Sequence, residues 1–262
     1  MRQFFKFTLA TVVGIFLFSL LSFLFLLAIA SSSGGGEVKI TKPSVLELSL
    51  SGPIYDRTTE SPFENFDPFT GDLIDGIGLH DLVDQIAKAR DNENIKGIYL
   101  KATFLQCGYA SAREIRRALL DFKSTGKFIY AYSEGYTQKA YYVVSAADSI
   151  FLNPEGIMEF KGLQAQVSFP LDMLAKIGVE PQVIRHGKYK SAVEPFLRND
   201  MSPANKEQTV AFIGSIWDAA VTEIAESRGH SADHMNALAD SMAIFMGEEA
   251  LAVGLVDALS YK

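Results

Sequence analysis

The most apolar stretch of the chain lies near its start, where residues 8–30 carry no charged side chain. Arg2 and Lys6 precede this stretch, and the next charge is Glu37. A helix of this length spans roughly 35 Å, which is enough to cross a bilayer. The pattern therefore predicts a transmembrane anchor within residues 1–30. The N-terminus is predicted to be cytoplasmic and the remaining chain to lie outside, because the positive charges precede the span.

A cleaved signal peptide is the alternative interpretation of this stretch. The sequence Ala28-Ile29-Ala30 before Ser31 imitates the small-residue cleavage site of secreted proteins. The apolar stretch is longer than the roughly 7–15 residues of a signal-peptide core, which favours an anchor that is retained. Residues 31–43 begin with Ser and Gly and predict a flexible linker. Residues 44–262 are long enough to form one domain with a full core.

Beyond the linker, the spacing of apolar residues alternates between the period of a strand and that of a helix. Strands are predicted at residues 45–50, 95–104, 128–132, 149–152 and 181–185. Helices are predicted at residues 79–89, 112–122, 139–147, 170–177 and 203–227, the last with Ser202 as N-cap and with Phe212 and Trp217 on its apolar face. This repeated order predicts an α/β fold whose parallel strands are covered by helices.

Three further segments carry weaker patterns. Residues 55–75 are rich in Pro, Asp, Phe and Gly, which predicts a long loop. Residues 160–169 are predicted to run extended, away from the main sheet. Residues 243–259 predict a helix, a glycine cap and a final strand.

Composition excludes several function classes. The net charge of -7 and the absence of a Lys/Arg run after the anchor argue against a nucleic-acid partner. Cys107 is the single cysteine, so an intrachain disulfide is impossible, and we expect a small buried apolar side chain. His230 and His234 share a helical face without an intervening glutamate, so no metal site is predicted. Nucleotide-binding glycine motifs and the Gly-x-Ser-x-Gly elbow are also absent.

One lysine stands out by its position between two predicted elements. Lys190 follows the predicted strand 181–185 and precedes a short helix, for which Ser191 as N-cap and Glu194 three residues later form a predicted capping box. Most lysines are solvated. The alternative is a buried lysine that acts as a general base. Lowering a lysine pKa from about 10.4 to about 7 costs on the order of 4–5 kcal/mol, so this role requires a dry pocket.

The stretch around Lys190 also resembles a known family. The run from Lys188 to Phe196 and its continuation Arg198-Asn199-Asp200-Met201-Ser202-Pro203 are similar to the N-terminal half of the long form of bacterial signal peptide peptidase A, known as protease IV. The resemblance extends through most of the soluble body. It includes Tyr141-Tyr142, the Asn153-Pro154-x-Gly156 turn and the ending Gly254-Leu255-Val256-Asp257.

The resemblance implies a Clp protease/crotonase-like β-β-α superhelix and a Ser/Lys endopeptidase. Such an enzyme would be a single-pass protein of the bacterial inner membrane that degrades cleaved, hydrophobic signal peptides on the periplasmic side. By position, Lys190 would be the catalytic general base, which takes a proton from a serine hydroxyl so that the oxygen can attack a peptide carbonyl. The family implies no cofactor and no metal, and its members assemble into rings, so we expect a homo-oligomer.

The chain departs from the family where the nucleophile would stand. Short members carry Ser-Gly-Gly before the paired tyrosines, whereas this chain has Gln138-Lys139-Ala140. Residues 102–109 likewise lack the glycine-rich turn that helps to form the oxyanion hole. In the long form the second half supplies the serine, so we expect a serine-bearing C-terminal half or partner subunit. Ser133, Ser145 and Ser191 are alternatives without further support.

Two other functions remain open from the sequence. The chain could be an inactive, membrane-tethered module that uses the same fold to bind or assemble peptides. Acyl-CoA chemistry on a crotonase-like fold is the weakest alternative, because a periplasmic location would deny the protein that cofactor.

Overall fold

A computed structural model describes residues 1–32, 40–58, 76–184, 186–187, 189–241 and 244–262. The chain divides into two compact units, Met1–Thr41 and Lys42–Lys262. Most of the predicted linker 31–43 and of the predicted loop 55–75 lies outside the described residues. Tyr55, at the start of that loop, belongs to a short strand instead.

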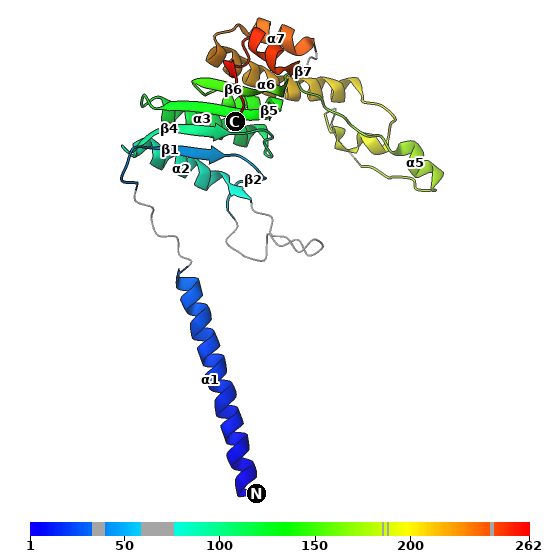
Figure 1. Cartoon of the computed structure of the whole chain (residues 1–262). Coiled ribbons are helices and arrows are strands. Elements are labelled where there is room, and N and C mark those ends of the chain that lie inside the picture. Colours follow the sequence, from blue (N-terminus) through cyan, green and yellow to red (C-terminus); the bar gives the residue numbers. More distant parts are fainter. Residues whose placement is uncertain (33–39, 59–75, 185, 188, 242–243) are drawn as a thin grey trace. The chain divides into compact units, whose positions relative to one another are not determined.

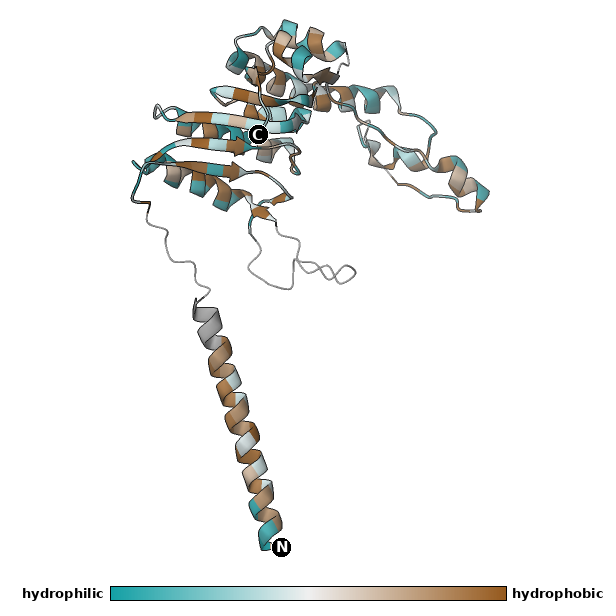
Figure 2. Ribbon diagram, in the orientation of Figure 1, coloured by the Kyte–Doolittle hydropathy of each residue, from teal (hydrophilic) through white to brown (hydrophobic). Residues whose placement is uncertain are grey.

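The first unit consists of the helix α1 (Arg2–Ser32), which is apolar around its circumference (Figure 2). Within the described part of the chain, α1 is the one helix that is long and apolar enough to cross a membrane, over Arg2–Leu26 with mean hydropathy 2.6. The hydroxyls of Thr8 and Thr11 donate to backbone carbonyls four residues earlier, each at 3.0 Å. These polar side chains are therefore satisfied inside the helix, as an apolar surrounding requires.

The second unit is built on a mostly parallel sheet, which confirms the predicted α/β class (Figure 1). Among the described residues it has the order β1-β4-β5-β6-β7, and β8 also pairs with β6. Among the described strands of this sheet, only β6 and β7 pair antiparallel. The strand bounds are β1 (Ser44–Ser49), β4 (Ile95–Lys101), β5 (Phe128–Tyr136), β6 (Ser149–Glu159), β7 (Ile244–Met246) and β8 (Ala258–Leu259). The short strands β2 (Ile54–Tyr55) and β3 (Ile77–Gly78) form a separate parallel pair.

Amphipathic helices supply the rest of the core. In α3 (Tyr109–Lys123), Ile115, Leu119 and Phe122 recur at helical spacing and are fully buried. Helix α3 lies beside α2 (Leu79–Asp91) (Figure 1). The other helices are α4 (Gln138–Val144), α5 (Leu171–Lys176), α6 (Pro203–Arg228), α7 (Ala232–Asp240) and α8 (Gly247–Ala252).

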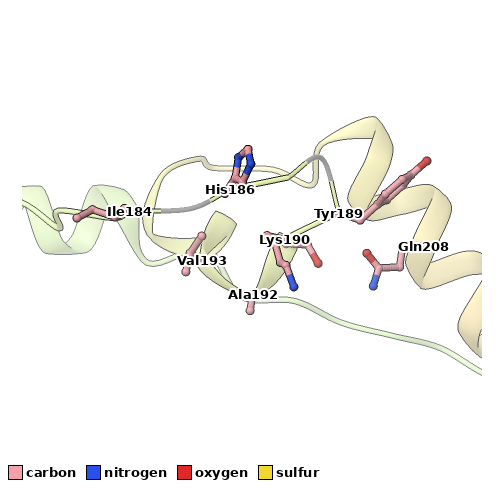
Figure 3. A pocket seen from close by; sticks show the side chains of 8 residues that line it. Ile184, His186, Tyr189, Lys190, Ala192, Val193 and Gln208 are labelled. Carbon is pink, nitrogen blue, oxygen red and sulfur yellow. The ribbon is translucent and has the colours of Figure 1, made fainter.

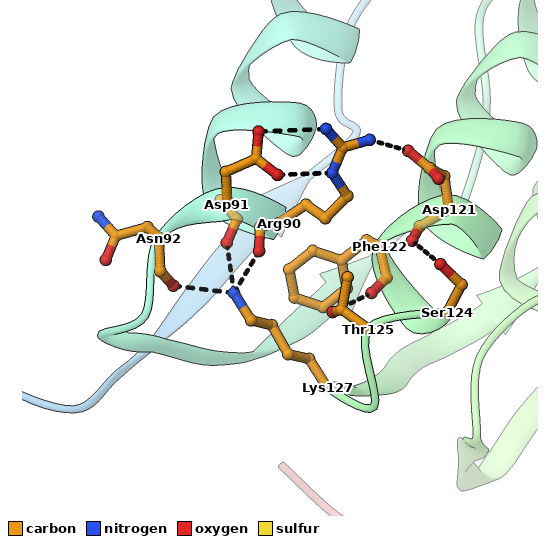
Figure 4. A network of polar contacts seen from close by, with 9 residues as sticks. Arg90, Asp91, Asn92, Asp121, Phe122, Ser124, Thr125 and Lys127 are labelled. Atoms are coloured by element: carbon orange, nitrogen blue, oxygen red, sulfur yellow. Dashed lines mark hydrogen bonds and ion pairs between the residues drawn. The ribbon is translucent and has the colours of Figure 1, made fainter.

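A lysine closes the C-terminal end of α2 (Figure 4). The Lys127 amine donates to the carbonyls of Ala89, Arg90 and Asn92 at 2.9, 2.6 and 2.8 Å. The final carbonyls of a helix have no partner within it, and a cation there also interacts favourably with the helix dipole. Desolvation lowers the pKa of Lys127. The contact ties α2 to the residue that directly precedes β5.

A buried arginine connects α6 to the core. Arg116 of α3 is 1% exposed and donates to the carbonyl of Tyr142, the hydroxyl of Ser145 and the carbonyl of Glu223. Its guanidinium also lies 3.4 Å from the Glu223 carboxylate, and burial lowers the pKa of Arg116. The Tyr142 hydroxyl donates to the same carboxylate at 2.6 Å. Helices α3, α4 and α6 are thus held by one polar network.

The Gly-Leu-Val-Asp ending is a structural tie. Gly254 has φ 73°, a left-handed conformation that favours glycine. The carbonyl of Leu255 accepts the Tyr141 hydroxyl at 2.7 Å. The Asp257 carboxylate accepts the amide of Ile150 at 2.7 Å and pairs with Arg228 at 2.8 Å. These contacts join β6, α4 and α6 to the final strand.

Several predicted elements need correction. The strand predicted to end at residue 152 continues to Glu159, because the pairing of β5 with β6 shifts register near Ser133 and resumes after Pro154. Strand β7 was not predicted. The predicted strand 181–185 is wrong: residues 181–184 have no regular structure, and Arg185 lies outside the described residues.

Side-chain burial also differs from expectation at three positions. Phe212 was placed on the apolar face of α6 but is 65% exposed. Trp217 is only partly buried: its indole donates to Asn236 at 2.8 Å and its ring lies 5.5 Å from that of Phe160. Cys107 is likewise only partly buried, and burial raises the pKa of its thiol.

Candidate functional site

The predicted base lies in a segment that we call the lysine arm, residues 161–200. It leaves the sheet after Phe160, contains α5 and the 3-10 helix η1 (Ser191–Phe196), and ends before α6. Residues 161–170 form no helix or strand, in line with the expected extended run. Among the described residues of the arm, only Glu194 is buried. Lys188 lies outside the described residues.

Lys190 is the residue that precedes η1, as predicted, but the capping arrangement is different. The N-cap of η1 is Lys190, with φ -88° and ψ 67°, and no side chain caps the turn. Ser191 is its first residue, so the predicted Ser191–Glu194 capping box is wrong. The carboxylate of Glu194, which is 2% exposed, turns instead towards the start of α6.

The Glu194 carboxylate accepts hydrogen bonds from Ser202, the predicted N-cap of α6. The hydroxyl of Ser202 donates to Glu194 Oε1 at 2.6 Å, and its amide donates to Oε2 at 3.2 Å. The same hydroxyl accepts the amide of Asn205 at 3.1 Å, which confirms the N-cap. The turn that follows Lys190 is therefore joined to α6 through a buried charged group.

Lys190 lines a pocket of about 430 Å³ (Figure 3). The lining comes from the arm and, through Gln208, from α6. Lys190 is exposed to solvent in this single chain, so the dry pocket that a general base requires is not formed by its own residues. The lining residues are Ile184, His186, Tyr189, Lys190, Ser191, Ala192, Val193 and Gln208.

The position at which the family resemblance puts a serine is occupied by a buried glutamine. Gln138 opens α4 directly after β5 and is 8% exposed. Its Oε1 accepts the amides of Lys161 and Gly162 at 2.8 and 2.9 Å, and its Nε2 donates to the carbonyl of Gly162 at 2.9 Å. A longer contact of 3.4 Å reaches the hydroxyl of Tyr109.

The loop between β4 and α3 is held against the same end of β5. The amine of Lys139 donates to the carbonyl of Cys107 at 2.5 Å. The amide of Thr137 donates to the carbonyl of Thr103 at 3.1 Å, and the hydroxyls of Thr103 and Ser133 lie 2.6 Å apart. This loop, where the resemblance led us to expect a glycine-rich turn, is held by these side-chain and backbone contacts.

A second pocket lies where β1 and β4 end. Its volume is about 280 Å³, and it adjoins the same loop. The carboxyl ends of parallel strands are a common place for ligand pockets in α/β folds. The lining residues are Ser49, Leu50, Ser51, Gly52, Lys101, Thr103, Phe104 and Gln106.

The alternative nucleophiles do not assemble with Lys190. Ser133 is buried and donates to the carbonyl of Gly135, and Ser145 donates to the carbonyl of Tyr142 and accepts from Arg116. Ser191 lines the lysine pocket but is the adjacent residue in the chain.

The rings of His230 and His234 lie 5.0 Å apart. In the part of the chain that the structure describes, no cluster of three metal-ligating side chains occurs.

Comparison with known proteins identifies the family. A model of peptidase family S49 matches residues 121–262, which include α4, the lysine arm and α6. This chain belongs to peptidase family S49. Protease 4 of Haemophilus influenzae is 35% identical over 218 residues, covering 81% of this chain and 35% of that protein. Protease 4 of Salmonella typhi is 33% identical over 239 residues, covering 86% of this chain and 39% of that protein.

A plant relative shows the same partial coverage. The chloroplastic serine protease SPPA of Arabidopsis thaliana is 34% identical over 191 residues, covering 73% of this chain and 27% of that protein. The S49 chain therefore spans between about a quarter and two fifths of the length of these relatives. The resemblance to a bacterial signal peptide peptidase is confirmed at the level of the family.

Proposed function

We propose that this S49 chain supplies the general base, Lys190, of a Ser/Lys endopeptidase that degrades cleaved signal peptides. The serine comes from a second, related body, either a C-terminal half or a partner subunit. The observation that carries the proposal is a contrast within the family region. Lys190 borders an open pocket, whereas Gln138, at the expected serine position, is engaged in hydrogen bonds to the backbone.

The proposed reaction divides the work between the two bodies. The neutral Lys190 amine takes the proton of the serine hydroxyl while the serine oxygen bonds to the peptide carbonyl carbon. The resulting lysine ammonium then returns a proton to the leaving amine, and the acyl-enzyme is hydrolysed by water. No metal or cofactor takes part in this scheme.

The exposed surface of the lysine arm supports the proposal that a second body covers it. A lysine base needs surroundings that exclude water, and Lys190 is open to solvent here. Large apolar side chains are also exposed along the arm, where soluble surfaces usually avoid such patches. A second S49 body placed on this surface would cover both, which fits the expected homo-oligomer. The exposed side chains are Met173, Ile177, Val179, Ile184, Phe196 and Leu197.

Helix α1 supports a single-pass membrane anchor. Its span Arg2–Leu26 is apolar, its threonines are satisfied internally, and its side chains are exposed around the helix. Arg2 and Lys6 at its start favour a cytoplasmic N-terminus, with the peptidase body on the periplasmic side of a bacterial inner membrane. Signal peptides left after export would then lie in the same membrane to which the peptidase body is tethered.

A peptide-binding module without catalysis is the second candidate. The pocket at the ends of β1 and β4 favours it, because this pocket includes the apolar Leu50 and Phe104 and does not involve Lys190. Under this function, hydrophobic peptides would bind to the isolated chain, and Lys190→Ala would leave that binding unchanged.

Turnover by the assembled enzyme separates the two candidates. The chain is combined with its serine-bearing half in detergent, and cleavage of a hydrophobic signal-peptide substrate is followed. We expect Lys190→Ala to lower kcat by 10³-fold or more, and Ser191→Ala, the neighbouring control, to lower it less than about threefold. Retained turnover in Lys190→Ala, or peptide binding without any turnover by the wild-type assembly, contradicts the proposal.

A further inference from the structure

Few side chains of the lysine arm are buried, so its position depends on the contacts at its two ends. Glu194 is the one buried side chain among the described residues of the arm. Chain segments without buried apolar contacts keep much of their conformational freedom. A base that must meet a serine of another body therefore depends on contacts that fix the arm where it leaves and rejoins the core.

Gln138 fixes the point of departure. The last core residue before the arm is Phe160, which is fully buried and packs 6.1 Å from the ring of Tyr141. The next two residues are held by Gln138, whose amide both accepts from and donates to Gly162. Gly162 has φ 84°, so the chain turns there in a conformation that favours glycine.

The chemistry of the side chain suits this contact closely. Two amide protons, from Lys161 and Gly162, converge on Oε1, and one carbonyl oxygen faces Nε2. The amides of Asn and Gln carry an acceptor and a donor on one planar group whatever the pH. A serine lacks the reach, a glutamate lacks the donor, and a lysine lacks the acceptor. The three hydrogen bonds pair the glutamine side chain with the backbone much as a neighbouring strand would.

We propose that Gln138 is a positioning residue that anchors the lysine arm. At the position where the resemblance puts the serine, this chain then carries a residue that holds the arm, and with it Lys190, in place. The opposite end of the arm is held by Glu194 and Ser202. The anchoring role stands on the hydrogen bonds alone, and its catalytic consequence rests on the proposed function.

Amide hydrogen exchange in the full chain tests the anchor directly. Gln138→Met keeps the volume of the side chain and removes its hydrogen bonds, and Gln85→Met on the exposed face of α2 is the matched control. We expect tenfold or faster exchange in the peptide that covers residues 161–170 of Gln138→Met, and unchanged exchange in β4 and α3. Unchanged exchange at residues 161–170 overturns the proposal.

A second variant covers the case in which Gln138→Met loosens the whole domain. When ionised, Gln138→Glu keeps both acceptor contacts and turns a carboxylate oxygen towards the Gly162 carbonyl, which loses its donor. We expect an intermediate acceleration, of about threefold, confined to the start of the arm. Exchange equal to the wild type in this variant, measured at a pH at which the introduced carboxyl is ionised, overturns the proposal.

Kinetics of the assembled enzyme test the catalytic consequence. Misplacing a catalytic group by about 1 Å can cost on the order of 10²-fold in rate. We expect Gln138→Met to lower kcat at least tenfold with KM within threefold of the wild type, and Gln138→Glu to recover part of kcat. A loosened arm with kcat within twofold of the wild type overturns the positioning role. If Lys190→Ala also retains turnover, the proposed function fails separately, and the exchange data still decide the anchor.

Discussion

The carboxylate of Glu194 accepts a 2.6 Å hydrogen bond from the hydroxyl of Ser202, across the short segment between η1 and α6. That hydroxyl in turn accepts the amide of Asn205. One buried acid therefore closes the turn that starts at Lys190 and completes the N-terminus of α6. The sequence predicted that Glu194 caps its own turn, but its carboxylate binds Ser202, eight residues further along the chain.

Removing this acid should loosen both elements. Hydrogen bonds to charged groups contribute about 1.5–3 kcal/mol, and the Ser202 amide would lose its partner. We expect Glu194→Ala to lower the free energy of unfolding by about 2–3 kcal/mol. The control Glu180→Ala, at an exposed arm position, should change it by less than about 0.5 kcal/mol. Urea unfolding followed by the fluorescence of Trp217 in α6 measures both, and equal midpoints would contradict the assignment.

Arg116 should matter more than its neighbour Arg117. Its guanidinium is buried among three helices, whereas the side chain of Arg117 is 61% exposed. Arg116→Met removes the donor to the carbonyls of Tyr142 and Glu223, whereas the Glu223 carboxylate keeps the Tyr142 hydroxyl and Arg113. Loss of a hydrogen bond from a buried acceptor typically costs about 1–3 kcal/mol. Arg117→Met should cost less than about 0.5 kcal/mol. Thermal unfolding of the two variants provides the comparison, and similar losses would show that the network is not important for stability.

Acid should weaken the tie between the final strand and β6. Burial alone would raise the pKa of Asp257, but hydrogen bonds from Arg228 and the Ile150 amide outweigh it and lower that pKa below its ordinary 3.8. A lowered carboxyl pKa stabilises the fold above the ordinary value, and this stability is lost as the pH falls through that value towards the folded one.

Asp257→Asn should therefore have a smaller fall in Tm between pH 5 and pH 3 than the wild type, because it no longer takes up a proton on unfolding. The control Asp240→Asn, at an exposed position, should follow the wild-type curve. Parallel curves for wild type and Asp257→Asn would contradict the role of this carboxylate.

The spacing of apolar residues was sufficient to predict the helices and strands whose apolar faces pack against other parts of this chain. Residues 112–122 repeat apolar side chains every three or four positions, and α3 buries that face. The same reasoning failed at residues 181–184, where Val183 and Ile184 resemble a strand but Ile184 is fully exposed. An apolar run predicts burial, yet it does not say whether the covering surface belongs to this chain or to a partner.

The site depended on contacts that no local pattern contains. Gln138 and Gly162 are separated by 24 residues, and nothing near either residue in the sequence indicates that they pair. The strand that continues through Pro154 is similar, because its register is set by β5 and not by its own residues. Lys190 stood out by its local position, but only the family motif indicated a catalytic role, and that role stays a prediction because Lys190 is exposed in the single chain.

Exposed apolar side chains of the arm should contribute to assembly and not to folding. Ile184 is fully exposed and lines the pocket of Lys190, so a charge there meets only water in the single chain. In a complex it would be buried and unpaired, which is costly. We expect Ile184→Asp to weaken assembly at least tenfold while the free energy of unfolding of the dissociated chain stays within about 0.5 kcal/mol of the wild type.

Sedimentation velocity in detergent, over a dilution series, measures this assembly. Leu120→Asp is the matched control, because Leu120 is 40% exposed on α3, outside the arm. It should leave the dilution curve unchanged. If Ile184→Asp assembles as well as the wild type, or if Leu120→Asp dissociates the assembly equally, the lysine arm is not the contact surface. The water around Lys190 would then have to be excluded by a rearrangement of the arm within this chain. Hydrogen exchange of the arm, compared before and after assembly, would detect such a rearrangement.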